Sequence, residues 1–122
     1  SYPSNSFNRI SGVKEFVQFL NEKNNNNIKN IVVNDRLLFA SLGYAYRSNQ
    51  VSLYTPHATG DRIANHFQLK NSLPNNFSKD FILIGYKDSV NYLNKKKKIN
   101  LLGSRGFPFS GSNIEIYEVI IE

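Results

Sequence analysis

The sequence predicts an α/β fold, a layered sandwich with a mostly parallel central sheet, and three observations lead to this class. First, apolar residues alternate along the chain between helical spacing and the short, continuous runs typical of strands covered on both faces. Second, these patterns follow one another in the order α-β-α-β-loop-β-α-β-β, which favours a layered architecture. Third, a length of 122 residues is typical of one domain with a hydrophobic core of its own.

The first helix is expected to begin after residue 11, because residues 1–10 are polar and contain a proline. We interpret residues 1–10 as a lead-in that lies outside the packed domain. Ser11 can cap the free amide groups of the first helical turn. An apolar stripe at helical spacing then runs through Val13, Phe16, Val17 and Leu20. The asparagine run at 24–27 is expected to end the helix, since short amide side chains compete for backbone hydrogen bonds.

A strand-helix-strand unit is predicted next. Residues 28–34 are short, β-branched and apolar, which is typical of a strand buried on both faces. Residues 35–47 switch to the helical period, with Asn34 or Asp35 placed to cap the helix. Residues 50–55 are predicted to form the second strand.

A long loop follows this unit, because residues 56–76 show no sustained period and contain two prolines. Residues 80–86 form the strongest buried-strand pattern in the chain. Asp88 is placed to cap a short helix, which we expect to pass through Val90 and Leu93 and to run into four consecutive lysines.

The chain is predicted to finish as an antiparallel hairpin. Its strands are residues 98–105 and 114–121, and a loop rich in Gly, Pro and Ser joins them. Right-handed crossovers place the second strand on one side of the first strand and the third strand on the other side. The predicted sheet therefore has a 2-1-3 core, with the hairpin at or near the far edge and helices on both faces.

Composition restricts the partners and the chemistry. The net charge of +6 favours anionic partners such as nucleic acid, phospholipid headgroups or acidic glycans, although codon bias toward lysine and asparagine would give the same balance. The absence of cysteine excludes disulfides, thiolate zinc sites and cysteine nucleophiles. No apolar run approaches the roughly 20 residues that span a bilayer. Because the sequence contains no methionine, we expect a processed chain or a piece of a longer one.

Motifs for a bound cofactor or metal are weak. The first strand-to-helix turn contains no glycine, which disfavours a dinucleotide-binding phosphate loop. His57 and His66 lie in one loop with Asp61 between them, but without the close spacing of dedicated metal ligands. A ribonuclease-like use of the two histidines with a Lys or Arg is an alternative for a small basic domain. We expect no metal and no cofactor.

The lysine run, which consists of Lys95, Lys96, Lys97 and Lys98, is the most concentrated charge in the chain. We expect it at the C-terminal end of a short helix, where cations are favourable and remain solvated. The alternative is contact with phosphates of lipid headgroups or nucleic acid. Because no aromatic residues are interleaved with these lysines, anionic lipid is favoured over nucleic acid, and we expect no nucleic-acid partner.

Three parts of the chain together resemble a known family. They read "NIVVNDRLLFASLGYAYR", "VSLYTP", and "NHFQLKNSLP" followed by "FILIGY". Over residues 28–121 this pattern resembles the C-terminal soluble domain of GT-C type membrane glycosyltransferases, those of the dolichyl-phosphate-mannose protein mannosyltransferase type that are related to the bacterial aminoarabinose transferase. The most specific pieces are Asp35 and Arg36 between a strand and a helix, and Asn65, His66 and Phe67 ahead of an apolar strand.

The resemblance implies an accessory role. In such proteins a bundle of membrane helices transfers a sugar from a polyprenyl-phosphate donor, and the soluble domain lies on the periplasmic face of the bacterial inner membrane. Residues 1–10 would then lead in from a preceding membrane segment, and residues 11–122 would form one domain, expected to be a monomer when isolated. The catalytic carboxylate belongs to the membrane portion, so no residue of this chain is expected to be catalytic.

The resemblance also implies roles for the motif residues and the partners. Loop organisation or partner contact is expected of Asp35, Arg36, Asn65, His66 and Phe67. The expected partner is the membrane-embedded part of the same polypeptide, with anionic lipid contact by the lysine run. Two other classes remain open: a free-standing nuclease or toxin-like enzyme that uses His57 and His66, and a nucleic-acid-binding module that uses the lysine run.

Overall fold

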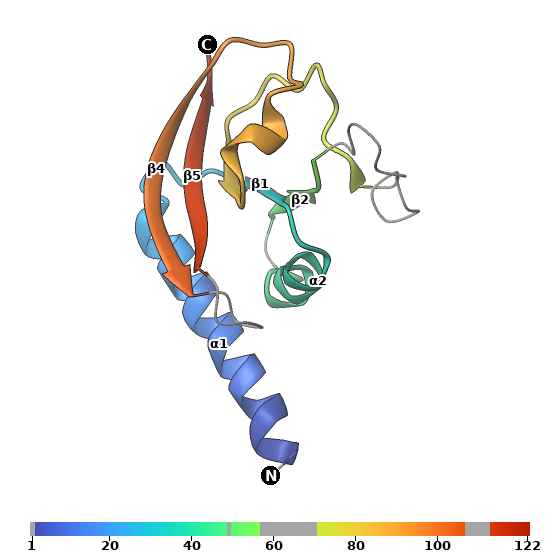
Figure 1. Cartoon of the computed structure of the whole chain (residues 1–122), viewed down its shortest axis with the longest axis vertical. Coiled ribbons are helices and arrows are strands. Elements are labelled where there is room, and N and C mark those ends of the chain that lie inside the picture. Colours follow the sequence, from blue (N-terminus) through green and yellow to red (C-terminus); the bar gives the residue numbers. More distant parts are fainter. Residues whose placement is uncertain (1, 49, 57–70, 107–112) are drawn as a thin grey trace.

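The computed structural model describes residues 2–48, 50–56, 71–106 and 113–122, with side chains from residue 12 onward, and shows one twisted sheet with helices against it (Figure 1). The elements in chain order are α1 (Tyr2–Lys23), β1 (Asn30–Val33), α2 (Arg36–Ala45), β2 (Ser52–Tyr54), β3 (Phe81–Ile84), the 3-10 helix η1 (Lys87–Val90), β4 (Lys97–Gly106) and β5 (Asn113–Ile121).

The five strands lie in the order β2-β1-β3-β5-β4. β1 pairs in parallel with β2 on one side and with β3 on the other, so that Ile31 lies between Leu53 and Ile82. β5 is antiparallel to both β3 and β4. The predicted 2-1-3 parallel core and the C-terminal antiparallel hairpin at the far edge are therefore confirmed.

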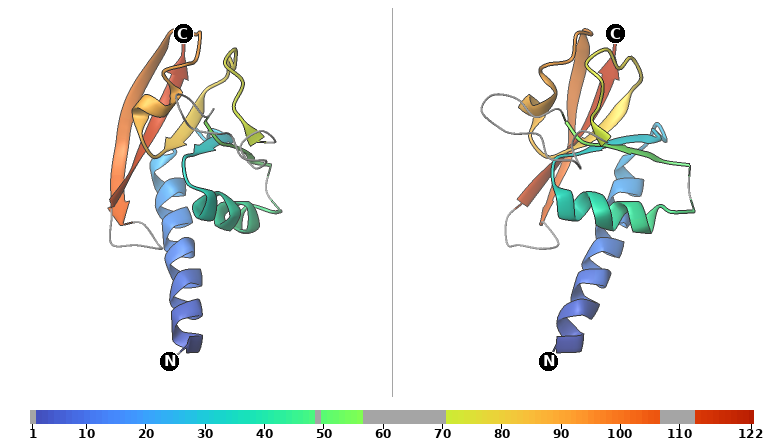
Figure 2. Two further views of the ribbon diagram at one scale, coloured as in Figure 1. Left: turned by 45° about the vertical axis from the view of Figure 1, so that its right-hand side comes forward. Right: turned by 90° about the vertical axis from the view of Figure 1, so that its right-hand side faces the viewer.

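Helices α1 and α2 pack on the same face of the sheet (Figure 2). Phe16 of α1 and Leu38 and Leu42 of α2 are completely buried there. We call this cluster the helix-side core, and its buried members are Phe16, Leu20, Ile31, Val33, Leu38, Leu42, Tyr46, Ile82, Ile84 and Ile116. The predicted apolar stripe of α1 faces this core, because Phe16 and Leu20 are buried and Val17 packs against them.

A second core covers the opposite face of the sheet. Its buried members are Val32, Leu73, Phe81, Leu83, Val90, Leu93, Tyr117 and Val119. Phe77 adds an edge-to-face contact to Phe81, with ring centroids 6.0 Å apart. The Tyr92 hydroxyl donates a hydrogen bond to the Leu73 carbonyl at 2.7 Å. Among the described residues η1 and loop segments form this layer, so α-helices on both faces are not confirmed.

The short helix near Asp88 is a single 3-10 turn and does not reach the lysines. Successive i to i+3 bonds join Ser89 N–H to the Tyr86 carbonyl at 3.0 Å and Asn91 N–H to the Asp88 carbonyl at 3.1 Å. The Ser89 hydroxyl also donates to the Tyr86 carbonyl at 2.7 Å. Such side-chain bonds compete with α-helical pairing, which explains why the predicted continuation was wrong.

α1 begins at Tyr2 and not after Ser11, so the predicted start of the helix and the predicted Ser11 cap were wrong. Proline disrupts the interior of a helix, but Pro3 lies in the first turn, where a backbone N–H would make no intrahelical hydrogen bond. The N-terminal half of α1 projects beyond the sheet in every view (Figures 1 and 2). The backbone of α1 therefore leaves the body of the domain as a continuous helix.

The asparagines after α1 end the helix as predicted. Asn24 bonds Ile28 twice, since its side-chain oxygen accepts from Ile28 N–H at 2.9 Å and its amide donates to the Ile28 carbonyl at 2.9 Å. Asn27 adopts a φ of 53°, a conformation that asparagine tolerates better than most residues. These two residues turn the chain from α1 into β1.

Helix α1 packs against the edge strand β4 through the side chain of Phe19. The Phe19 ring fills the space that a side chain on Gly103 would need, because a Cβ there would lie 2.8 Å from Phe19 Cζ. The Arg105 guanidinium lies 5.2 Å from the centre of the same ring and is 3.3 Å from the Glu15 carboxylate. This contact joins the two ends of the sequence.

The ends of β1 and β3 approach each other closely at Gly85. Asn34 N–H donates to the Ile84 carbonyl at 3.1 Å, and Gly85 N–H donates to the Glu115 carbonyl at 2.9 Å. Gly85 has a φ of 131°, a region that L side chains rarely adopt. A methyl group on Gly85 would also lie 2.7 Å from Asn34 Cβ.

We expect Gly85→Ala to lower the free energy of unfolding by about 2–4 kcal/mol, because it adds both backbone strain and a steric clash. Gly106→Ala is the matched control, since no atom lies within 4 Å of the added methyl, and its effect should stay within about 0.5 kcal/mol. Urea denaturation measures both values. Equal effects of the two substitutions would contradict this account of Gly85.

Candidate functional site at the carboxyl edge of the parallel strands

The carboxyl ends of β1 and β3 form the place where the sheet topology favours a site. After β1 the chain turns to α2 on one face, and after β3 it turns to η1 on the other face. Ligands of open α/β sheets bind outside the strand ends at which the connections diverge in this way. The loops at this edge begin with Asn34 and Gly85, and Glu115 joins them through its carbonyl bond to Gly85.

Asp35 has a defined structural role at this edge. Its backbone is extended, with φ −139° and ψ 132°, and its carboxylate accepts a hydrogen bond from Leu38 N–H at 2.9 Å. This is the N-cap of α2, which confirms one of the two predicted capping residues. Arg36 follows as the first residue of α2 and is exposed. Asp35 therefore holds the start of α2 against the edge of the sheet.

A buried tyrosine and a carboxylate lie on β5 near the same edge. The Tyr117 hydroxyl donates a hydrogen bond of 2.6 Å to Glu115 Oε1. This bond, together with burial and the negative charges of Glu115 and Asp88, raises the pKa of Tyr117 to about 12. Tyr117 is therefore a neutral donor over the physiological range. The pair was not predicted from the sequence. Its only signal there is the spacing of two along a strand, which places both side chains on one face.

The chain on either side of residues 57–70 is fixed at the carboxyl end of β2. Thr55 N–H donates to the Asn71 carbonyl at 2.8 Å, and Leu73 N–H donates to the Thr55 carbonyl at 2.8 Å. The Thr55 side chain is only 3% exposed, and within the described ranges its hydroxyl has no hydrogen-bond partner. Asn65, His66 and Phe67 lie outside the described residues, as do His57 and Asp61.

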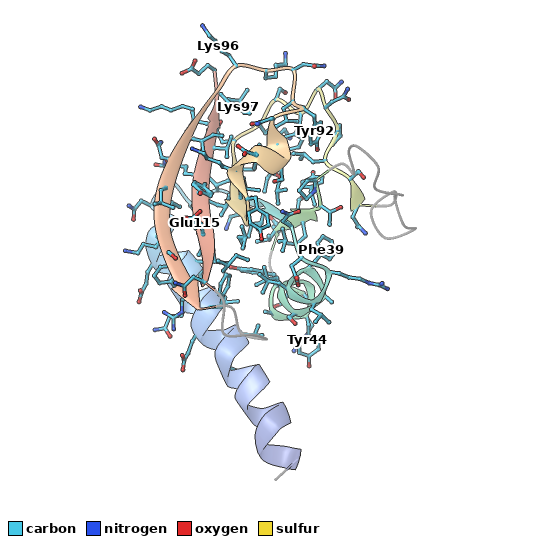
Figure 3. The ribbon with its side chains drawn as sticks, viewed as in Figure 1. Phe39, Tyr44, Tyr92, Lys96, Lys97 and Glu115 are labelled. Carbon is cyan, nitrogen blue, oxygen red and sulfur yellow. The ribbon has the colours of Figure 1, made fainter. Side chains whose placement is uncertain are left out.

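The lysine run does not end a helix, so that expectation was wrong. Lys95 and Lys96 precede β4, and Lys97 and Lys98 are its first two residues, paired with Ile121 and Ile120. Lysines on an edge strand oppose pairing with another sheet, which is the simplest role for this run. Figure 3 shows Lys96 and Lys97 at the end of the molecule opposite to the start of α1.

The described part of the chain holds no group of three or more histidine or acidic side chains suited to a metal ion. Within the same ranges, no helix combines the length and the apolar character that a bilayer crossing requires.

Comparison of the chain with protein-family models, with curated proteins and with solved structures found no match. The fold places the chain in the class of mixed α/β domains, with a parallel 2-1-3 core and a C-terminal antiparallel pair of strands.

We expect Asp35→Ala to lower the free energy of unfolding by about 1 kcal/mol through loss of the α2 cap. Asp35→Asn is the matched control and should retain most of the stability, because asparagine caps helices comparably well. Thermal and urea denaturation of the two variants measure the difference. Identical losses in both would show that the carboxylate acts through its charge and not as a cap.

The raised pKa of Tyr117 predicts a pH window. An unfolded tyrosine titrates near 10, so the stabilisation from the neutral hydroxyl is complete below about pH 10 and is lost as the pH rises through about 12. Glu115→Gln should move the pKa of Tyr117 back toward its ordinary value, because the strongest hydrogen bond to the neutral form is weakened.

The measurement is tyrosinate absorbance during a pH titration, with Tyr117→Phe subtracted to isolate this residue. Glu118→Gln serves as the control, since Glu118 follows Tyr117 on β5 and so points to the opposite face. If Glu115→Gln left the Tyr117 titration in place, the hydrogen bond would not be its cause.

Proposed function

We propose that this chain is an extracytoplasmic accessory domain of an integral membrane glycosyltransferase that uses a polyprenyl-phosphate-linked sugar donor. Its role is structural or acceptor-positioning, and it is not catalytic alone. One observation carries the proposal: the described parts of the segments on which the family resemblance rests form one contiguous unit of the fold. They supply β1 with α2, β2 and β3, which lie side by side as the parallel core.

The course of α1 supports this assignment. Its N-terminal half extends away from the sheet as a continuous helix (Figure 2), in the manner of a helix that joins the domain to another part of a polypeptide. In the proposal that part is the membrane-embedded portion, and the domain lies on the periplasmic face of the bacterial inner membrane. The catalytic carboxylate and the donor-binding groups belong to that portion.

The carboxyl edge is the proposed contact region. Asp35 orients α2 there. The sequence segment that contains Asn65, His66 and Phe67 is bounded on both sides by residues that meet at Thr55, at the end of β2. Acceptor or membrane-portion contact is assigned to Arg36 and to these loop residues. The isolated domain is proposed to be a monomer.

The isolated 122-residue chain should transfer no sugar when it is incubated with labelled polyprenyl-phosphate sugar and an acceptor, because the reacting groups lie in the membrane portion. The full-length parent protein under the same conditions is the positive control. Turnover by the isolated chain above a buffer blank would refute the accessory role.

The sequence upstream of Ser1 provides the second test. The proposal expects about ten apolar segments of membrane-spanning length there. If the full-length protein has no such segments, the glycosyltransferase proposal is wrong, whatever the transfer assay of the isolated chain shows.

A further inference from the structure

Helix α2 is apolar on the side turned away from the core as well as on the side that packs. Its only charged residue is Arg36. Leu37 and Tyr44 are 62% and 70% exposed, and their separation of seven positions places them on one side of the helix. Ala40 is exposed between them. We call Leu37, Ala40 and Tyr44 the outer face of α2.

The outer face stands out from the rest of the described surface. Among the described residues the large exposed apolar side chains are Leu37, Tyr44, Tyr86 and Leu101. Tyr86 directly follows Gly85, which touches Asn34 just before α2 begins. Two of these four residues, Leu37 and Tyr44, therefore lie on α2. Apolar exposure concentrated in one place marks an interaction surface more often than scattered exposure does.

Two arginines flank the outer face, Arg36 at the start of α2 and Arg47 just after its end. The Arg47 guanidinium lies 4.1 Å from the centre of the Tyr44 ring and donates to the Tyr44 carbonyl at 2.8 Å. No acidic residue lies in the first turn of α2, and the carboxylate of Asp35 is engaged as the cap. Tyrosine and leucine flanked by arginine suit the boundary between lipid headgroups and acyl chains, where aromatic rings are half buried and guanidinium groups meet phosphates.

We infer that the outer face of α2 docks on an anionic phospholipid surface. Figure 3 shows Tyr44 on the side of α2 turned toward the end of the molecule at which α1 begins. The lysine run lies at the opposite end, so one flat bilayer cannot contact both. The inference rests on the proposed function for the presence of a bilayer beside the domain, and it replaces the lysine run as the lipid contact.

Two labelled variants locate the contact. The chain contains no cysteine, so Ala40→Cys and Lys96→Cys each offer a single site for an environment-sensitive fluorophore. With vesicles of phosphatidylcholine and phosphatidylglycerol, the label at position 40 should shift to the blue and the label at position 96 should not. Vesicles of phosphatidylcholine alone, or high salt, should remove most of the shift, because screening weakens the attraction.

A second experiment measures what the outer face contributes. The double variant Leu37→Ser and Tyr44→Ser should bind the anionic vesicles about tenfold more weakly in a sedimentation assay, because binding scales with the apolar area buried. Leu101→Ser is the matched control, since Leu101 is 58% exposed but lies on β4; it should change binding less than about twofold. Urea denaturation verifies that each variant is folded.

Several results would overturn the inference. They are a shift at position 96 without one at position 40, unchanged binding by the double variant, and no vesicle binding at all. The last result would leave a protein as the occupant of the outer face. None of these results bears on whether membrane-spanning segments lie upstream, so failure of the docking surface is distinguishable from failure of the proposed function.

Discussion

The whole fold depends on the parallel pairing of β1 with a neighbour on each side. Because both of its edges are used, the backbone of β1 makes ladder hydrogen bonds in both directions. Its side chains then divide between two cores, with Ile31 and Val33 on the helix side and Val32 on the other. A central strand of this kind is stable only when both faces are covered, so α2 on one side and the segment around Leu73 on the other are both required.

The same pairing explains where chemistry-bearing residues gather. The strands β1, β2 and β3 run in one direction, so their carboxyl ends meet at one edge, and the connections leave that edge toward opposite faces. Gly85 allows the two loops to approach within contact distance, and the bond from Gly85 N–H to the Glu115 carbonyl draws in β5. Backbone hydrogen bonds and the close approach at Gly85 therefore define the carboxyl edge of the parallel strands.

The core strands and their order were predictable, because short apolar runs and right-handed crossovers leave few arrangements for a chain of this length. The start of α1 was not, since Pro3 is a breaker in the interior of a helix but acceptable in its first turn. The lysine run was misplaced for a related reason: Val90 and Leu93 are three positions apart, a spacing that an α-helix and a 3-10 turn share.

The candidate site was predictable only where local rules govern it. The Asp35 cap follows from a polar residue ahead of an apolar helical pattern. The bond between Tyr117 and Glu115 was missed because a Glu-x-Tyr spacing on a strand is common and its meaning depends on burial. The helical period of residues 35–47 indicates the buried side of α2, where Leu38 and Leu42 lie. It does not show that the apolar residues on the other side, Leu37 and Tyr44, stay exposed.

The packing of Phe19 against Gly103 affects the order in which the domain folds. Glu15 and Arg105, which flank this contact, are 90 positions apart, so α1 reaches β4 only after the long segment between them has been made. Contacts of such long range slow folding. The stripe of α1 through Phe16 and Leu20 can pack against α2 earlier, but Phe19 stays uncovered until the C-terminal hairpin forms. The closing of that hairpin therefore completes the domain.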